Sequence, residues 1–432
     1  MRSGTAGGRC DAQRFCTGIG WPRRTGSIGR AHVVATLDDE DLAGGELVAA
    51  LRADTAGCAN VVHFNNAGSA LPPKPVVERV IRHLRSEEAV GGYEAAGAVA
   101  EELAAVHGDL AALVGADPAE IAVVDSATRA WLAVFTALPL SAGDRILTSV
   151  PEYSSNIIAM RSAAESRGVR VDVVPSAESG EICTDSLRAM LGEDVRVVAV
   201  THAPTNGGLL QPLAEIGRIV ADSPAVFLVD ACQSVGQVPI DIAAVGADAL
   251  AVTGRKYLRA PRGTGFLAVR RGLLEQLTPV HLDLHSATAE GSGFRLREDA
   301  KRFELWERDV AAVLGLAEAA RYYRRVGIGP AHRRITALAE HLRGELDGIP
   351  GAEVTDLGTE RSGIVAFRSD RVAAPDLQAR LREAGINTTV SRAPSTPWDM
   401  QRRGLDEMVR ASVHYYNTRA ELDRLCEVVA AA

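Results

Sequence analysis

The sequence predicts an α/β fold in which a large part holds a mainly parallel seven-stranded sheet flanked by helices and a smaller C-terminal part is α+β. Seven short apolar runs predict the strands, at residues 119–126, 144–150, 169–175, 195–203, 225–231, 249–255 and 264–270. Helical patterns such as 154–168 and 212–223 separate most of these runs. Near-continuous apolar strands alternating with helices are typical of a parallel sheet that is covered on both faces.

The chain before and after this sheet has its own patterns. Residues 1–35 hold many Arg and Gly and lack the apolar centre of a secretory signal, so we expect a disordered leader or a start assigned too far upstream. An acidic-capped helix is predicted over 37–54, and a short strand, a turn and an amphipathic helix follow from residue 61. After about residue 308 a long helix leads into mixed helices and strands. We therefore expect a cofactor-binding domain over 36–307 and a small domain over 308–432.

Composition limits the classes of function. The 432 residues carry a net charge of -8 without a clustered basic face, which disfavours nucleic acid as a partner. No apolar run reaches 18 residues, so no membrane span is predicted. The cysteines are scattered without metal-binding spacing, which predicts no metal site and a reduced, cytoplasmic protein.

Polar side chains stand where the predicted strands end. In open parallel sheets, ligands bind at the carboxyl ends of the strands. These ends carry Ser126, Ala127 and Thr128, then Glu152 and Tyr153, Thr205 and Asn206, Asp230 and Gln233, and Thr253, Arg255 and Lys256. Small hydroxyls, an aromatic ring, an amide, a carboxylate and a lysine suit a planar, phosphorylated, electron-poor ring. Neither a P-loop nor a dinucleotide-binding motif follows a strand, so a nucleotide-binding protein is disfavoured.

Two segments in order, VDACQSVGQVPIDI with Asp230 and TGRKYLRAPRGTGFL with Lys256, resemble the class V aminotransferase family. Its members are fold-type I enzymes that use pyridoxal 5′-phosphate (PLP), and they include cysteine desulfurases and isopenicillin N epimerase. The resemblance extends from HFNNAGSALPP, which begins at His63, to RASVHYYNT, which contains Asn417. The family's fold agrees with the alternating pattern of strands and helices.

The resemblance implies roles around the cofactor. Lys256 would hold the PLP aldehyde and later move the substrate's α-proton, and burial with nearby arginines would favour its neutral amine. Asp230 would keep the pyridine nitrogen protonated, so that the ring accepts electrons from the α-carbon. Gln233 would lie near the phenolic oxygen, and Tyr153 would stack on the ring.

The same resemblance implies anion-binding residues. The turn of Ser126, Ala127 and Thr128 would bind the phosphate, together with Thr253 and Arg255. Thr264, after Gly263, would reach the phosphate of a neighbouring subunit, which implies a homodimer with shared active sites. Arg410 would grip the substrate's α-carboxylate. Asn206 would assist it beside the cofactor, and the turn of Asn66, Ala67 and Gly68 would line the same pocket.

The reaction is less clear from the sequence than the cofactor. Family desulfurases carry a mobile cysteine shortly before the Arg-Ala-Ser motif, but no cysteine lies between Cys232 and Cys426, which disfavours a persulfide-forming desulfurase. The segments 91–99 (GGYEAAGAV) and 303–316 (FELWERDVAAVLGL) resemble the C–S lyase and epimerase branches. We therefore predict a cysteine S-conjugate β-lyase of sulfur or natural-product metabolism, which releases thiol, pyruvate and ammonia.

Other readings stay open. An aminotransferase, an amino-acid epimerase, or a decarboxylating or oxidative PLP enzyme would use the same scaffold. Arg392, Arg402 and Arg403 either read a second substrate carboxylate or belong to a solvated loop. An inactive PLP-fold scaffold is disfavoured, because a binding role would not need Lys256, Asp230 and Arg410 together.

Overall fold

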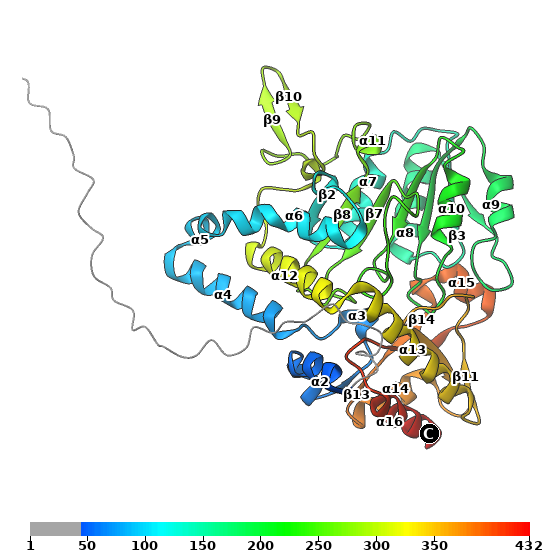
Figure 1. Ribbon diagram of the computed structural model, residues 1–432. Helices are drawn as coiled ribbons and strands as arrows, with labels where there is room; N and C mark the ends of the chain where they lie inside the picture. Colours follow the sequence, from blue (N-terminus) through cyan, green and yellow to red (C-terminus); the bar gives the residue numbers. More distant parts are fainter. Residues whose placement is uncertain (1–44) are drawn as a thin grey trace, which may run out of the picture. The chain divides into compact units, whose positions relative to one another are not determined.

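The computed structural model describes residues 45–432. The expected leader over 1–35 and the start of the helix expected over 37–54 lie outside the described residues. Two larger sheets organise the described part, one of seven strands and one of four (Figure 1). The domain division at residues 307 and 308 stays a prediction.

The seven-stranded sheet has the order β2-β8-β7-β6-β5-β3-β4. Only β8 runs against its neighbours, so the other six strands point the same way. The strands are β2 (Ile121–Val124), β3 (Arg145–Ser149), β4 (Arg170–Val174), β5 (Val195–Thr201), β6 (Val226–Asp230), β7 (Ala249–Thr253) and β8 (Gly265–Val269). All seven predicted strands are present, and the predicted mainly parallel sheet is confirmed.

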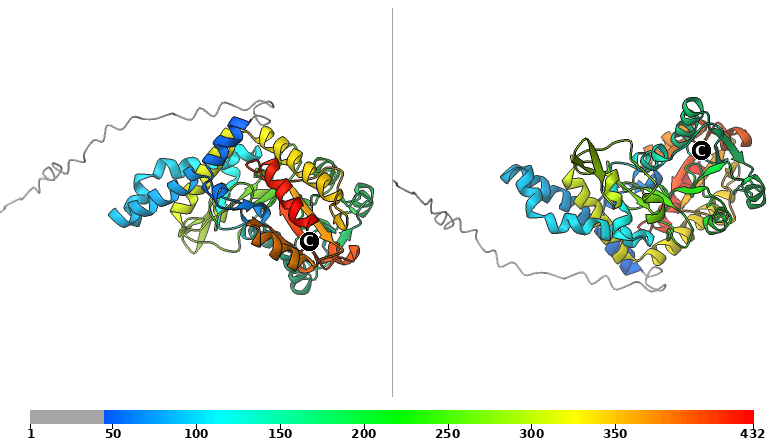
Figure 2. Two further views of the ribbon diagram at one scale, coloured as in Figure 1. Left: turned by 90° about the horizontal axis from the view of Figure 1, so that it is seen from below. Right: turned by 90° about the horizontal axis from the view of Figure 1, so that it is seen from above.

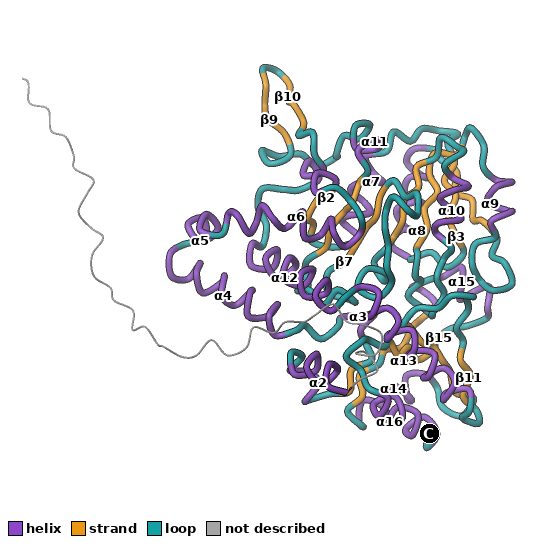
Figure 3. The backbone as a smooth tube through the Cα atoms, viewed as in Figure 1, coloured by secondary structure: helices purple, strands orange, loops and turns teal. Residues whose placement is uncertain are grey.

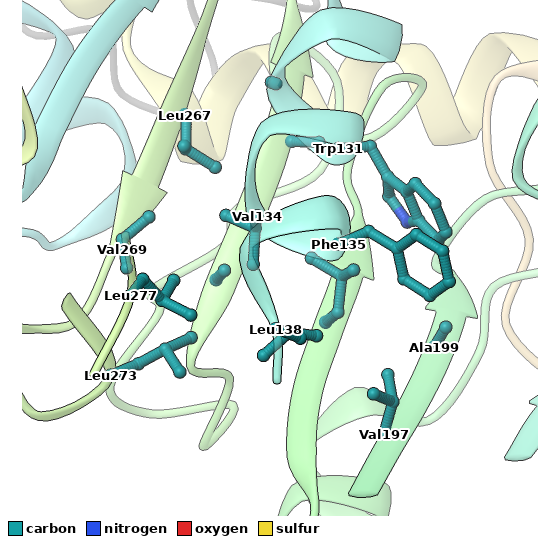
Figure 4. Packing of buried hydrophobic residues seen from close by; sticks show 14 of the residues in the cluster. Trp131, Val134, Phe135, Leu138, Val197, Ala199, Leu267, Val269, Leu273 and Leu277 are labelled. Atoms are coloured by element: carbon teal, nitrogen blue, oxygen red, sulfur yellow. The ribbon is translucent and has the colours of Figure 1, made fainter. Parts of the chain in front are cut away.

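Helices α7 (Ala127–Ala137) and α8 (Ser154–Arg167) pack against this sheet. Trp131 and Phe135 of α7 stack with ring centroids 4.5 Å apart and lie over the apolar side chains of the strands (Figure 4). The apolar residues of α7 recur at helical spacing and so form one apolar face. This face packs on the apolar side chains of the strands, which are almost all buried. This packing fixes the amino end of α7 at the carboxyl ends of the strands.

A second group of helices lies beside β2. Helix α12 (Val310–Val326) packs against α4 (Lys74–Val90) and α6 (Ala100–Val114), and α5 (Gly92–Ala98) connects the latter two (Figure 1). The other helices of the sheet region are α9 (Thr184–Met190), α10 (Leu213–Val220) and α11 (Arg271–Leu274), and strands β9 (Ala287–Glu290) and β10 (Gly293–Leu296) form an exposed hairpin. Several apolar side chains of α4 stay exposed, among them Ile81 and Leu84.

The four-stranded sheet is antiparallel, in the order β11-β12-β15-β14. Figure 3 labels two of its strands, β11 and β15. Its strands are β11 (Ala352–Val354), β12 (Ile364–Ser369), β14 (Thr389–Arg392) and β15 (Glu407–Ser412). Its helices are α13 (Ile328–Asp347), α14 (Ala374–Glu383), α15 (Pro397–Arg403) and α16 (Arg419–Ala430). Figure 2 shows α16 (red) next to α13 (yellow), and both bury apolar side chains against this sheet.

An early segment of the chain joins this later sheet. After α2 (Gly45–Ala53), strand β1 (Val62–His63) pairs in parallel with β13 (Ile386–Asn387), and Asn65 bridges to Ser412 of β15. The short helix α3 (Asn66–Ser69) follows at once. The turn predicted to line the substrate pocket is therefore held against β15, which carries Arg410.

No helix within residues 45–432 has both the length and the apolar character needed to cross a membrane.

Candidate active site

A cavity of ≈ 260 Å³ opens where strands of the large sheet end. Ligand pockets commonly span about 300–1,000 Å³, so this one suits a small ligand. Nine predicted site residues line it, namely Ser126, Ala127, Thr128, Tyr153, Asp230, Gln233, Thr253, Arg255 and Lys256. The remaining predicted residues, Asn66, Ala67, Gly68, Asn206, Thr264 and Arg410, are not among its lining residues.

Lys256 follows β7 and is 9% exposed. Its Nζ donates to Cys232 Sγ at 3.2 Å. Burial lowers the pKa of Lys256, and the positive charge of Arg255 lowers it further, against the opposing effect of Cys232 and Asp230. A larger fraction of the amine is therefore neutral than in an exposed lysine, as a nucleophile or a base requires.

Asp230 is the last residue of β6, and the parallel register places it beside Thr201 of β5 and Ala251 of β7. One oxygen, Oδ1, accepts from Cys232 N at 2.9 Å, and Oδ2 accepts from Asn156 Nδ2 at 3.1 Å. Burial raises the pKa of this carboxyl, whereas the hydrogen bond from Cys232 N and the charge of Lys256 oppose the rise. A basic ring nitrogen would therefore find a strong acceptor here.

The turn at residues 126–128, which was predicted to bind a phosphate, lines the same cavity. Ser126 caps α7, since its Oγ accepts from Arg129 N at 3.2 Å, and the helix begins at Ala127. Free N–H groups at a helix start attract anions. The hydroxyls of Thr128 and Thr253 and the guanidinium of Arg255 lie around the same cavity, which gives a phosphate several donors.

Tyr153 and Gln233 also lie at this cavity. Tyr153 stays 36% exposed although it lines the cavity. Gln233 Nε2 donates to Ala67 O at 3.1 Å, whereas its Oε1 is buried without a partner. An unsatisfied buried acceptor is costly, so this oxygen suits a ligand that donates a hydrogen bond.

The turn at residues 66–68 supports the site from outside the cavity. Asn66 Nδ2 donates to Ser412 O at 2.6 Å, and its Oδ1 accepts from Tyr416 Oη, which uses both ends of the side chain. Arg255 NH1 donates to Gly68 O at 2.6 Å. The predicted contact of this turn with substrate stays untested.

Arg410 lies in β15 and is 7% exposed. One nitrogen donates to Thr205 O at 3.0 Å and to Thr205 Oγ1 at 2.7 Å, and the other donates to Asn65 Oδ1 at 3.3 Å. Its Nε has no partner, and within residues 45–432 no carboxylate pairs with it. Burial lowers its pKa to about 10, so it stays charged at neutral pH. A buried guanidinium without a counter-ion is suited to binding a carboxylate ligand.

Asn206 and the segment before β15 meet outside the cavity. Asn206 Nδ2 donates to Thr396 Oγ1, and Asn206 Oδ1 is buried without a partner. Among the three arginines considered for a second carboxylate, Arg403 already binds Asp399 at 3.2 Å and the carbonyl of Thr355. Arg392 lies 3.8 Å from Glu407, and Arg402 is exposed. Arg402 is therefore the least committed of the three.

Thr264 faces a different hollow. Its Oγ1 donates to Pro261 O at 2.6 Å, and the residue lines a second cavity with Glu304, Leu305 and others. Gly263 lines both cavities. Thr264 and Lys256 therefore line different cavities, and the predicted contact of Thr264 with a neighbouring subunit's phosphate stays a prediction.

Sequence reasoning missed Asn65, which bonds Arg410, Asn156, which bonds Asp230, and Cys232, which contacts Lys256. Thr205 was named from the sequence as a strand end, and the structure adds that it accepts from Arg410. Cys232 had a signal, because it follows Asp230 by two positions. Nothing in the sequence marks Asn65 over Asn66. Within the described residues, no group of three or more His, Cys, Asp or Glu side chains is arranged to hold a metal ion.

Comparison with known proteins decides the family. Residues 62–425 match the aminotransferase class-V family. The chain belongs to the aminotransferase class-V family. A probable cysteine desulfurase from Methanothermobacter thermautotrophicus is 30% identical over 376 residues, which cover 85% of this chain and 94% of that protein. A cysteine desulfurase from Yersinia pseudotuberculosis is 28% identical over 375 residues, which cover 84% and 91%.

Solved structures share the fold. Apo cysteine desulfurase from Thermococcus onnurineus superimposes with a TM-score of 0.82 at 24% identity, over 89% of this chain and 97% of that one. The cystine C–S lyase C-DES, in complex with its reaction product cysteine persulfide, gives 0.78 at 25% identity, over 87% and 99%. As a class V enzyme, the chain uses PLP as its cofactor.

The residues present fit this cofactor. An aldehyde requires an amine that is partly neutral, a pyridine nitrogen requires a buried carboxylate, and a phosphate requires several donors. Lys256, Asp230 and the start of α7 supply these groups around one cavity. The unpartnered Oε1 of Gln233 adds an acceptor in the same place.

Proposed function

We propose that this PLP enzyme is a lyase that cleaves the C–S bond of a cysteine S-conjugate by β-elimination. One water enters, and the products are a thiol, pyruvate and ammonia. The α-proton and the C–S bonding electrons leave the amino acid, and the thiolate takes up a proton. No oxidant, reductant or keto acid is consumed.

PLP supplies an electron sink for the substrate's α-carbon when it is bound. Lys256 Nζ removes the α-proton, which its burial and lowered pKa favour. Arg410 binds the α-carboxylate, and its Nε, which has no partner within the described residues, is a donor left for this contact. The start of α7, with Thr253 and Arg255, would hold the phosphate of the bound cofactor.

The observation that carries the choice of a lyase is the segment between β13 and β15. It contains no cysteine, and its Thr396 is 1% exposed and hydrogen-bonded to Asn206. A protein persulfide requires a thiol that reaches the substrate's sulfur and then carries it away. This segment instead carries the hydroxyl of Thr396 and the helix α15, which contain no thiol.

Cys232 is the one thiol among the residues lining the cavity. Burial raises its pKa, so the thiol stays protonated and is a weak nucleophile. Its Sγ also lies against Lys256 rather than on a mobile segment. These properties favour a packing role over sulfur transfer.

The relatives support C–S chemistry on a cysteine derivative. The similar structure of C-DES is that of a cystine C–S lyase, and cystine is itself a cysteine whose sulfur carries a substituent. Relatives named as cysteine desulfurases act on the same C–S bond. The lyase reaction needs only the groups that line this chain's cavity, together with Arg410.

We also propose that the enzyme is a homodimer whose subunits share their sites. Apolar side chains of α4 and α5 are exposed, among them Leu84, Val90 and Tyr93 at 50%, 58% and 76%. Exposed apolar patches of this kind favour a protein interface. Sedimentation of the holoenzyme as a dimer would support the proposal, whereas a monomer that retains full PLP binding would contradict it.

The reaction is tested by incubating the holoenzyme with S-substituted cysteines and no keto acid. We expect thiol and pyruvate in equal amounts over many turnovers. Strict dependence on an added keto acid would instead indicate an aminotransferase. Loss of optical rotation without new products would indicate an epimerase, and a protein-bound persulfide would indicate a desulfurase. Lys256→Ala is the matched control for release of thiol without the enzyme.

A further inference from the structure

Two buried polar residues behind Asp230 have no role in the reaction described above. Asn156 lies in the first turn of α8, and Glu152 lies just before that helix after β3. Both are almost inaccessible, at 3% and 1% exposed. A buried polar side chain destabilises the fold unless its donors and acceptors form hydrogen bonds.

Asn156 joins two carboxyl groups. Its Nδ2 donates to Glu152 Oε1 at 2.8 Å and to Asp230 Oδ2 at 3.1 Å. The amide nitrogen has two hydrogens, and carboxylate oxygens accept hydrogen bonds, so only this orientation of the amide satisfies both neighbours. Each hydrogen of Asn156 is thereby used on one carboxyl.

The hydrogen bonds of the Asp230 carboxylate within the protein leave it able to accept further hydrogen bonds. Oδ1 is held by Cys232 N, and Oδ2 is held by Asn156 Nδ2. An ionised carboxylate can accept about four hydrogen bonds. Since Asp230 also lines the cavity, the remaining acceptor positions are available to a ligand there.

Glu152 holds Asn156 from the other side. Its Oε1 accepts from Asn156 Nδ2, from Thr201 Oγ1 and from Tyr153 N. Its Oε2 meets only the hydroxyl of Thr148, at 3.1 Å. A hydroxyl can accept as well as donate, so a proton on Glu152 belongs at Oε2, and the contact with Asn156 survives in both protonation states.

We propose that Asn156 and Glu152 are positioning residues that fix Asp230 as the acceptor for the pyridine nitrogen of PLP. Asn156 sets the orientation of the Asp230 carboxyl, and Glu152 sets the orientation of Asn156. The inference depends on the cofactor and not on whether the enzyme is a lyase. Its failure would therefore leave the proposed reaction untouched.

The arrangement also couples the cofactor to pH. Burial raises the pKa of Glu152 to about 7, although Thr201 and Asn156 oppose the rise. Glu152 is thus neutral below this pH and negative above it, where its charge favours a protonated pyridine nitrogen. The charge that acts on Glu152 is that of Asp230, and Lys256 and Arg255, after β7, are the cationic groups of the same cavity. His202, after β5, is neutral because burial lowers its pKa to about 4. Strand β3 and helix α8 contribute only Thr148 and Asn156 to the contacts of Glu152.

The first test is the substitution Asn156→Asp, which keeps the shape of the side chain and replaces the donor by an acceptor. We expect the dissociation constant of PLP to rise by about 10- to 100-fold, the range typical of losing a hydrogen bond to a charged group. The measurement is PLP titration of the apoenzyme followed by visible absorption. Ser155→Ala, in the same turn of α8, is the matched control and should bind PLP as the unmodified chain does.

The second test is Glu152→Gln, which preserves shape and removes the titration. Holoenzyme with Glu152 should show a spectral step near pH 7, and the variant should lack it while still binding PLP. A purely structural role would lower thermal stability without moving this step. The proposal is overturned if Asn156→Asp binds PLP like the Ser155→Ala control, or if the step persists in Glu152→Gln. If Asn156→Asp does not fold, the presence or absence of the pH-dependent spectral step in Glu152→Gln tests the proposal by itself.

Discussion

Two buried arginines, Arg410 and Arg259, show how similar groups serve different purposes. Neither pairs with a carboxylate within the described residues, and both are nearly inaccessible. Arg259 donates to Leu71 O at 2.8 Å, to Tyr415 Oη at 2.8 Å and to Thr55 Oγ1 at 2.5 Å. Its guanidinium also lies over the rings of Tyr322, Tyr415 and Tyr416.

The two arginines differ in whether any nitrogen of the guanidinium group lacks a hydrogen-bond acceptor. Every nitrogen of Arg259 has an acceptor, whereas Nε of Arg410 has none. A cation whose donors are all satisfied, with aromatic faces around it, stabilises the fold without any ligand. A cation with unused donors gains from binding an anion. Burial and charge therefore do not distinguish Arg410 from Arg259, whereas the number of N–H groups without an acceptor does.

Substitution of Lys256, which lies only three residues before Arg259, should have the largest effect on turnover. Lys256→Ala should reduce turnover by at least roughly 10²–10⁴-fold, the usual contribution of a proton-transferring side chain. Thermal unfolding of the apoenzyme should change little, since the side chain of Lys256 donates its hydrogen bond to a thiol, which is a weak acceptor. Turnover assays and calorimetry on the same preparation check both expectations. Residual turnover near the wild-type rate would remove Lys256 from the mechanism.

Arg259→Leu should act on stability. It leaves the Leu71 carbonyl and two hydroxyls without their donor, and each buried unsatisfied group costs about 1–3 kcal/mol. We expect a loss of roughly 3 kcal/mol or more in the free energy of unfolding, measured by denaturant titration. The Michaelis constant of the protein that remains folded should be close to that of the unmodified chain. A raised Michaelis constant with unchanged stability would reverse the assignment.

Arg410→Ala should act on substrate binding. Loss of a hydrogen bond to a charged group costs about 1.5–3 kcal/mol, so amino-acid affinity should fall while PLP affinity is kept. Spectral titration with a substrate analogue measures this directly. Arg410→Lys should restore the charge without the fork of two donors and recover only part of the affinity. An unchanged affinity for the amino acid would refute the role.

Cys232→Ala should have the smallest effect. A thiol that only packs against Lys256 should change turnover less than about fivefold, which is below about 1 kcal/mol. Steady-state release of pyruvate is the measurement. Complete loss of activity would instead indicate that the thiol takes part in sulfur transfer, in place of the cysteine that the segment before β15 lacks.

Much of the fold and of the cofactor cavity follows from the sequence. Apolar runs that end near Asp230 and Lys256 reveal both the strands and the edge where a ligand binds, because strands and their ends are marked by local patterns. The contacts of Asn65 with Arg410 and of Asn156 with Asp230 join residues that are far apart in the chain. Such pairs depend on how the sheets are placed, and a single sequence carries no local signal for them. The full bonding of Arg259 is hidden for the same reason.

The bridge between Asn65 and Ser412 also bears on the order of folding. Ala67 N donates to Ser412 Oγ across 345 positions, so this contact closes only after almost the whole chain has been synthesised. The strands around Lys256 are complete by residue 269 and pair largely with near neighbours in sequence. Domains generally form from the N-terminal side during synthesis. A nascent chain would thus be able to assemble its cofactor cavity well before Arg410 arrives to make it selective for amino acids.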